Sequence, residues 1–170
     1  MNSVALFDQV CQKASKHTTY GYSTSFSLGI RSLDKRFHAP VHAIYGFVRF
    51  ADEIVDTFHG YDKQDLLRRF REDTHRSIAE GISLNPILHS FQRVVNTFHI
   101  EAELYDTFLD SMAMDLRDTA HDQQSYETYI LGSAEVVGLM CLRVFCEGDH
   151  ALYAKLKPSA MKLGAAFQKV

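Results

Sequence analysis

Apolar residues recur every three or four positions along almost the whole 170-residue chain, which is the spacing of amphipathic helices. No stretch alternates between apolar and polar residues over the length of a strand, so no β-strand is predicted. The sequence also lacks internal repeats, low-complexity tracts and linkers. The pattern therefore predicts an all-α protein with a single helical domain over residues 1–170.

Glycine, proline and polar capping residues divide this pattern into separate helices. Gly60 and Gly81 each follow an amphipathic segment and are expected to end it. Asn85 followed by Pro86 supplies a capping side chain and a first-turn proline, so a helix is expected to begin there. The predicted helices cover approximately residues 4–14, 41–58, 64–80, 86–98, 101–116 and 126–145, with a last one ending at 170.

Two polar stretches and one proline predict interruptions. Residues 17–25 and 32–40 are expected to be connections, and Pro158 is expected to break the last helix, which resumes at Ser159. The helical pattern then stops at Val170 without glycine, proline or a polar cap. We therefore expect the natural protein to continue beyond this residue.

Composition removes several classes of function. The net charge of −3 provides no basic field for nucleic acid, so no nucleic-acid partner is expected. The three cysteines have neither zinc-site nor disulfide-framework spacing, which favours a reducing cytoplasm. The sequence has no signal peptide and no apolar run of about 18 residues, so it predicts no transmembrane helix, although peripheral membrane contact stays open. Oligomeric state is not indicated.

The predicted helix 41–58 carries the strongest chemical pattern. Tyr45, Arg49, Asp52 and Asp56 fall within an arc of roughly 60° on a helical wheel. The rest of the circumference is mostly apolar, as expected of a buried helix. The polar stripe is therefore expected to face an interior cavity rather than bulk water.

Two aspartates on the polar stripe of a buried helix need a cation to offset their charges. Carboxylates at positions i and i+4 are about 6 Å apart, and at an effective dielectric constant near 20 their repulsion is on the order of 3 kcal/mol. Arg49 can offset one of these charges but not both. Because Mg²⁺ usually takes one or two carboxylates together with substrate phosphate oxygens, Asp52 and Asp56 with Arg49 and Tyr45 suit a magnesium–diphosphate complex. The alternative is a buried ion-pair network around Arg49.

Two further elements add weaker signals. Ser23, Ser25 and Ser27 alternate upstream, and their hydroxyls can donate to phosphate oxygens, although a serine run is also typical of a loop. Asp115 lies on the apolar face of the predicted helix 101–116, where a carboxylate needs a partner. That partner is either a core hydrogen bond or a group of the site.

These segments resemble the squalene/phytoene synthase family. The similarity lies in YSTSFS at 22–27, IYGFVRFADEIVD at 44–56, FLDSMAMDL at 108–116, YILGSAEVVG at 129–138 and LGAAFQ at 163–168. The segments occur in the family's order and cover nearly the whole chain. The resemblance implies an isoprenoid-synthase-type helical bundle and a head-to-head condensation of two prenyl diphosphates that depends on Mg²⁺, with Mn²⁺ as the alternative ion.

The resemblance also implies a role for each site residue. Asp52 and Asp56 look like the first aspartate-rich metal motif, and Ser23, Ser25 and Arg49 look like contacts of the substrate diphosphate. Tyr45, Asp115 and Tyr129 match family positions at the reacting end, the metal side and the departing diphosphate. Gln168 is placed among the diphosphate contacts, directly before the expected second aspartate-rich motif.

The sequence departs from the family pattern in two places. Glu53 follows Asp52 where the family often has a second aspartate, but the outer pair is intact, so metal binding is still expected. The second aspartate-rich motif is expected beyond Val170, so the 170-residue chain is expected to be inactive alone. Resemblance favours geranylgeranyl diphosphate and phytoene synthesis, in carotenoid biosynthesis. A squalene or dehydrosqualene synthase that uses farnesyl diphosphate is the alternative.

Two other classes of protein share features with the sequence. Glu72 with His75, and Glu147 with His150, have the Glu-x-x-His spacing of di-iron bundles. The first pair lies on the charged outer face of its helix and the second contains Gly148, so neither is expected to reach a bundle core. A non-catalytic prenyl-lipid-binding module stays open, and it differs from the enzyme in needing no metal.

Overall fold

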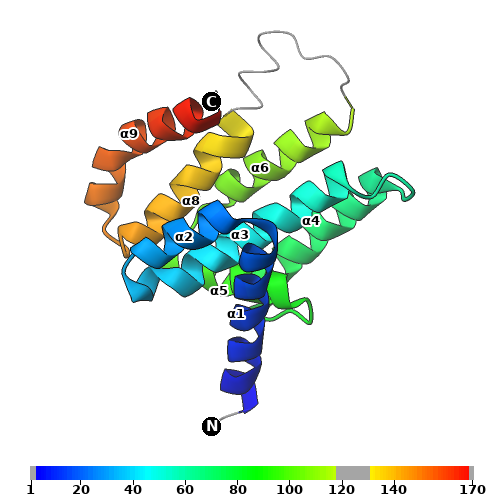
Figure 1. Ribbon diagram of the computed structural model, residues 1–170, viewed down its shortest axis with the longest axis horizontal. Helices are drawn as coiled ribbons and strands as arrows, with labels where there is room; N and C mark the ends of the chain where they lie inside the picture. The colour runs from blue at the N-terminus through cyan, green and yellow to red at the C-terminus, as the bar shows by residue number, and fades with distance from the viewer. Residues whose placement is uncertain (1–2, 118–130, 169–170) are drawn as a thin grey trace.

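The computed structural model describes residues 3–117 and 131–168, and the regular elements in these ranges are all helical (Figure 1). The described residues contain no strand, so the all-α prediction is confirmed. Within the same ranges, no helix combines the length and apolar character needed to cross a bilayer. The elements are α1 (Ser3–Tyr22), α2 (Thr24–Ser32), α3 (Lys35–Asp56), α4 (Lys63–Glu80), α5 (Pro86–Phe98), α6 (Ala102–Asp115), the π-helical turn η1 (Leu131–Glu135), α8 (Val136–Phe145) and α9 (His150–Gln168).

Helix α3 occupies the centre of the molecule. It packs against α1, α2, α4, α5, α6 and α8. Helix α9 lies on the outside, against α8 and η1, while the N-terminal half of α1 projects away from the other helices (Figure 1). The helix with the predicted polar stripe is therefore the one that most of the others surround.

A group of stacked aromatic rings holds α3 in this position. Phe47 is fully buried and stacks on Phe91 of α5, with ring centroids 3.9 Å apart and an interplanar angle of 4°. Its ring also lies 5.6 Å from the rings of Phe70 in α4 and Phe108 in α6. Aromatic side chains bury large apolar areas, so one residue of α3 links three surrounding helices through the hydrophobic effect.

The helix ends predicted from Gly81 and from Asn85 are confirmed, whereas α3 ends at Asp56, before Gly60, where its end was expected. Gly81 ends α4 in the left-handed conformation, with φ +70°, and its N–H donates to Ser77. The Asn85 side chain accepts from the N–H groups of Ile87 and Leu88, with Pro86 directly after it. These caps satisfy backbone groups that a helix cannot satisfy internally.

The predicted connection at residues 17–25 is wrong. Helix α1 continues to Tyr22, and α2 begins after one intervening residue, Ser23. Threonine usually competes with helical hydrogen bonding, but Thr18 and Thr19 donate to the carbonyl groups of Ala14 and Ser15 one turn back. Their hydroxyls are thereby satisfied inside the helix, which continues.

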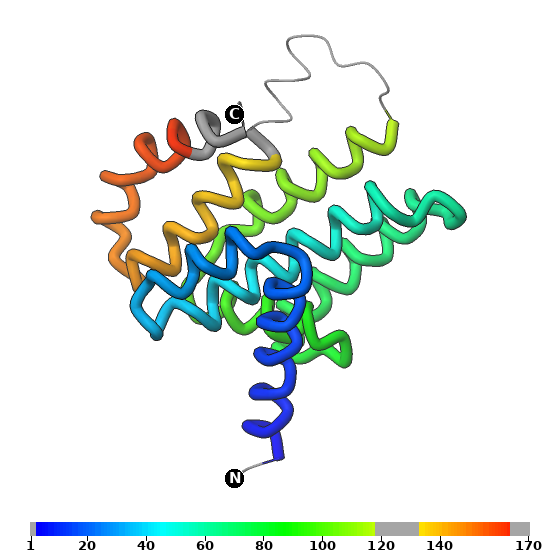
Figure 2. The backbone as a smooth tube through the Cα atoms, viewed as in Figure 1, coloured from blue at the N-terminus to red at the C-terminus, as the bar shows by residue number. Residues whose placement is uncertain are grey.

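Two proline-based predictions are also wrong. The connection at 32–40 is shorter than expected, because Asp34 caps α3 and Pro40 lies within the helix. Pro158 likewise lies inside α9. Because proline has no N–H, the helix lacks one backbone hydrogen bond at this residue. The axis of α9 turns part-way along the helix (Figure 2), as an interior proline permits.

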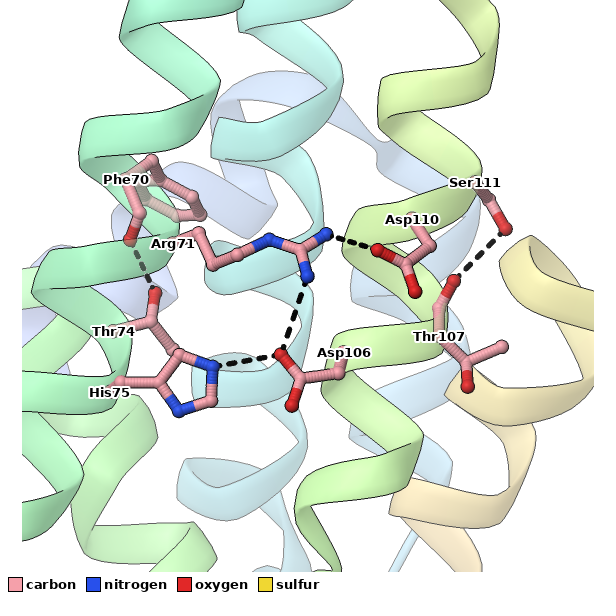
Figure 3. A network of polar contacts seen from close by, with 8 residues as sticks. All are labelled: Phe70, Arg71, Thr74, His75, Asp106, Thr107, Asp110 and Ser111. Atoms are coloured by element: carbon pink, nitrogen blue, oxygen red, sulfur yellow. Dashed lines mark hydrogen bonds and ion pairs between the residues drawn. The ribbon is translucent and has the colours of Figure 1, made fainter.

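Polar contacts fasten the outer helices to their neighbours. Asp8 of α1 bonds to His89 of α5, with 2.8 Å between Oδ1 and Nε2, and also pairs with Arg93. In Figure 3, Arg71 and His75 of α4 face two aspartates of α6. Arg71 lies 2.5 Å from Asp110 and 3.7 Å from Asp106, while His75 Nε2 lies 2.8 Å from Asp106.

The same contacts place the Glu-x-x-His pairs. His75 is exposed and bonded to Asp106, and Glu72 is exposed and bonded to Arg68 at 2.7 Å. Glu147 and His150 are exposed as well. All four side chains therefore lie on the outside of the bundle, in agreement with the sequence analysis.

Phe47→Ala should lower the free energy of unfolding by about 3–5 kcal/mol, because it leaves a cavity where four helices meet. Phe58→Ala is the matched control, since the Phe58 side chain is 37% exposed and should cost far less. Urea denaturation followed by circular dichroism measures both values. Equal losses in the two variants would show that the Phe47 stack does not organise the core.

Candidate functional site

The four residues predicted to share a stripe do so on α3. Tyr45, Arg49 and Asp52 are half-buried, and Asp56 at the end of the helix is exposed. The buried residues of the helix lie on its other faces, where the Phe47 stack and its neighbours hold it. The stripe is therefore fixed in direction by apolar packing behind it.

Asp52 lies in an unfavourable environment for a negative charge. Burial raises the pKa of its carboxyl group to about 6; the charges on Asp56, Glu53 and Asp115 add to this increase, and Arg49 opposes it. Asp115 acts from the last residue of α6. Its inward position, predicted from the helical wheel, thus brings it within electrostatic range of the stripe, while Asp115 also has an interaction partner of its own.

Arg49 is paired with a residue that sequence reasoning had not assigned to the site. Its guanidinium bonds to Glu53, and the two side chains are 27% and 12% exposed. Burial alone would raise the pKa of Glu53, but hydrogen bonds from Arg49 and Thr57 hold it below its usual value. The i, i+4 spacing of arginine and glutamate was the available signal for this pair.

One donor of Arg49 remains unused. Its Nε is buried and has no hydrogen-bond partner among the described residues, while its guanidinium carbon lies 4.4 Å from the centroid of the Tyr22 ring. A buried, unsatisfied charged donor is costly unless a ligand supplies the acceptor. Arg49 therefore has a donor left for an anion in addition to its bond with Glu53.

Tyr45 connects the stripe to the start of α2. Ser23 caps α2 by accepting from the Phe26 N–H at 3.1 Å, and its side chain also hydrogen-bonds to Tyr45. The ring of Phe26 lies 5.1 Å from that of Tyr45. Burial raises the pKa of the Tyr45 phenol, so this group is neutral at physiological pH.

The other two serines differ from Ser23. Ser25 is exposed in the first turn of α2. Ser27 is buried and donates to the carbonyl groups of Ser23 and Thr19, at 2.7 and 3.3 Å, which gives it a structural role. Of the three, Ser23 is the one that the fold brings to Tyr45.

Two predicted site residues lie outside what the structure describes. Tyr129 belongs to residues 118–130, beyond the described ranges. Gln168 is the last residue of α9, and the described side chains end before it. Their assignments remain predictions.

The donor set fits a divalent cation in part. Among the described residues, no three histidine, cysteine or acidic side chains converge on one point where a metal ion would be held. Mg²⁺ does not require such a cluster, because one or two carboxylates and the oxygens of a bound phosphate can complete its coordination. The raised pKa of Asp52 and the unused Arg49 donor match a shared Mg²⁺–phosphate ligand.

The cavity next to α3 is displaced from the stripe. A cleft of about 360 Å³ between α3 and α4 is bordered by Glu53, Tyr22, Phe58 and Arg69, and by apolar side chains of both helices. Neither Asp52 nor Asp56 lines it. This cleft therefore lies on the Glu53 side of α3 and is not the interior cavity expected in front of the stripe.

Comparison with known proteins identifies the family to which this arrangement belongs. The chain is 30% identical over 128 residues to a presqualene diphosphate synthase of Zymomonas mobilis, covering 72% of the chain and 43% of that protein. It is 29% identical over 166 residues to a phytoene synthase of Rhodobacter capsulatus, covering 94% of the chain and 45% of that protein. The chain therefore spans about half the length of the curated relatives it matches.

The fold agrees with these relatives. A crystal structure of a dehydrosqualene synthase in complex with ligand superposes with a TM-score of 0.78 at 23% identity, over 95% of this chain and 55% of that one. The sequence model of the squalene/phytoene synthase family matches residues 19–170, which include the whole polar stripe of α3. The chain belongs to the squalene/phytoene synthase family.

Proposed function

We propose that this chain forms part of an enzyme that joins two prenyl diphosphates head to head. The observation that carries the proposal is that one stripe of α3 holds both a desolvated Asp52 and a buried Arg49 donor with no partner among the described residues. The Asp52 carboxylate requires a cation, and the Arg49 donor requires an anion. A magnesium-bound diphosphate group supplies both.

In this proposal, Asp52 and Asp56 hold Mg²⁺, which when bound supplies Lewis-acid stabilisation of the departing diphosphate. Arg49 Nε donates to a diphosphate oxygen, while Glu53 keeps the guanidinium in place. Asp115 adds negative charge on the same side. These residues thereby bind and orient the leaving group.

Tyr45 and Phe26 act at the carbon end of the substrate. Loss of diphosphate from an allylic carbon leaves a carbocation, which the double bond of the second prenyl chain attacks. The faces of the neighbouring Tyr45 and Phe26 rings attract positive charge without forming a bond to it. The hydrogen bond from Ser23 fixes the Tyr45 side chain for this purpose.

We favour geranylgeranyl diphosphate as the substrate and phytoene as the product. The phytoene synthase relative supports this, because its similarity extends over 94% of the chain. Farnesyl diphosphate is the second candidate, favoured by the similarity to presqualene diphosphate synthases of Zymomonas mobilis and of Rhodopseudomonas palustris. The two candidates share the same diphosphate chemistry and differ in the length of the apolar tail.

The protein encoded by the complete gene should convert geranylgeranyl diphosphate to a C40 hydrocarbon when Mg²⁺ is present, as measured by chromatography of the extracted products. A C30 product from farnesyl diphosphate would identify the second candidate. The 170-residue chain should give neither product. Absence of both products from the complete protein would contradict the proposed function.

The 170-residue chain should nevertheless bind inorganic diphosphate in a magnesium-dependent manner, measured by isothermal titration calorimetry. Asp52→Asn with Asp56→Asn should weaken this binding by at least about tenfold, because both carboxylate ligands are lost. Asp110→Asn, an exposed aspartate of α6, is the control and should have no effect. Equal binding with and without Mg²⁺ would favour a lipid-binding module over a synthase.

Asp52→Asn should also stabilise the magnesium-free chain at neutral pH. Because the folded pKa of about 6 exceeds the ordinary aspartate value of 3.8, ionisation of Asp52 costs folding free energy as pH rises through this interval. The gain should therefore be small near pH 4 and reach on the order of 2 kcal/mol at pH 7. Denaturation of both proteins across this pH range measures it.

Exposed Asp56 provides the matched control, since Asp56→Asn removes a carboxylate from the same stripe at an exposed position and should change the stability less. A loss of several kcal/mol in Asp52→Asn would instead indicate that Asp52 belongs to a stabilising ion-pair network with Arg49.

A further inference from the structure

A second cleft lies on the opposite end of α3 from the aspartates. It has a volume of about 290 Å³, near the lower end of the range for small-molecule sites, and it lies between α1 and the first turns of α3. Its lining is basic and polar, with no acidic residue. The lining residues are Gln9, Gln12, Lys13, Lys16, Tyr20, Lys35, His38, Ala39 and His42.

The positive charge in this cleft is not neutralised by the protein. Lys13, Lys16 and Lys35 have no carboxylate partner among the described residues. The ammonium group of Lys16 lies 5.6 Å from the centroid of the Tyr20 ring. Asp34, the acid next to Lys35 in sequence, instead caps α3 and lies 3.9 Å from Arg36. In a chain of net charge −3, this is a local concentration of unpaired cations.

A buried histidine adds a hydrogen-bond acceptor to the cleft. His42 is 3% exposed, and its Nδ1 lies 2.8 Å from Thr19 Oγ1. The Thr19 hydroxyl donates to the Ser15 carbonyl, so it must accept from the Nδ1–H of His42. Nε2 then carries the lone pair, and it has no partner within the described part of the chain.

The charge state of His42 agrees with this assignment. Burial, together with the charges of Lys16 and His38, lowers the pKa of His42 to about 4, so the ring is neutral at physiological pH. His38 directs its own Nε2 to the Leu33 carbonyl at 2.9 Å. The cleft thus combines cations that suit an anion with a neutral acceptor that suits a hydroxyl group.

We propose that this cleft binds a small phosphate ester that carries a free hydroxyl group, with the phosphate on the lysines and the hydroxyl on His42 Nε2. Glycerophosphate is the simplest ligand of this class. It occurs free in solution and as the head group of phosphatidylglycerol, and the exposed Leu6 and Val10 on the same helix would face the lipid in the second case.

The test uses glycerol 3-phosphate in solution and vesicles of phosphatidylcholine with and without phosphatidylglycerol. All measurements contain EDTA, so that the magnesium-dependent site on α3 contributes nothing. Replacement of Lys13, Lys16 and Lys35 by glutamine should weaken binding by at least about tenfold, because it removes the charge-assisted contacts. The control replaces Lys155, Lys157 and Lys162 of α9, which are exposed, and changes the net charge equally.

Binding of glycerol 3-phosphate, or co-sedimentation that requires phosphatidylglycerol, supports the proposal and identifies the source of the phosphate. In the unsubstituted chain, the ligand should also shift the Cε1–H resonance of His42 in an NMR titration, which tests the site even if the lysine variant misfolds. Binding of neither probe, equal weakening in the control, or an unchanged His42 resonance would overturn the proposal.

Discussion

The stacking of Phe47 on Phe91 is the contact on which the rest of the arrangement depends. It sets the rotation of α3 about its own axis, because the buried ring must point towards α4, α5 and α6. Once that rotation is set, the positions of Tyr45, Arg49 and Asp52 follow from helical geometry. The polar stripe is thus placed by the apolar side chains behind it.

This placement has an energetic cost that a functional site can explain. Burial and the charges of three other carboxylates disfavour the ionised form of Asp52. A fold selected for stability alone would replace such a residue, since uncompensated charge weakens the folded state. Arg49 relieves only part of this cost, because its guanidinium is already shared with Glu53.

The sequence predicted most helices and much of the site, and each error has a physical reason. Helix ends marked by Gly81 and Asn85 were readable, because each residue has a specific local conformation or hydrogen bond. The continuation of α1 was not, because Thr19 is satisfied by contacts with Ser15 and with the distant His42. The inward position of Asp115 followed from helical periodicity alone. The pairing of Glu53 with Arg49 could not be assigned to the site in the same way, because the partial burial of the two side chains depends on the packing of neighbouring helices.

The joint between α1 and α2 consists of Ser23 alone, and this residue both begins α2 and bonds to Tyr45. Adding or removing one residue at the end of α1 would turn the point where the chain leaves that helix by about 100°. The rotation would carry the capping oxygen and the Phe26 ring away from Tyr45. The position of the Phe26 ring beside Tyr45 therefore depends on the number of residues between α1 and α2 as well as on the serine hydroxyl that caps α2.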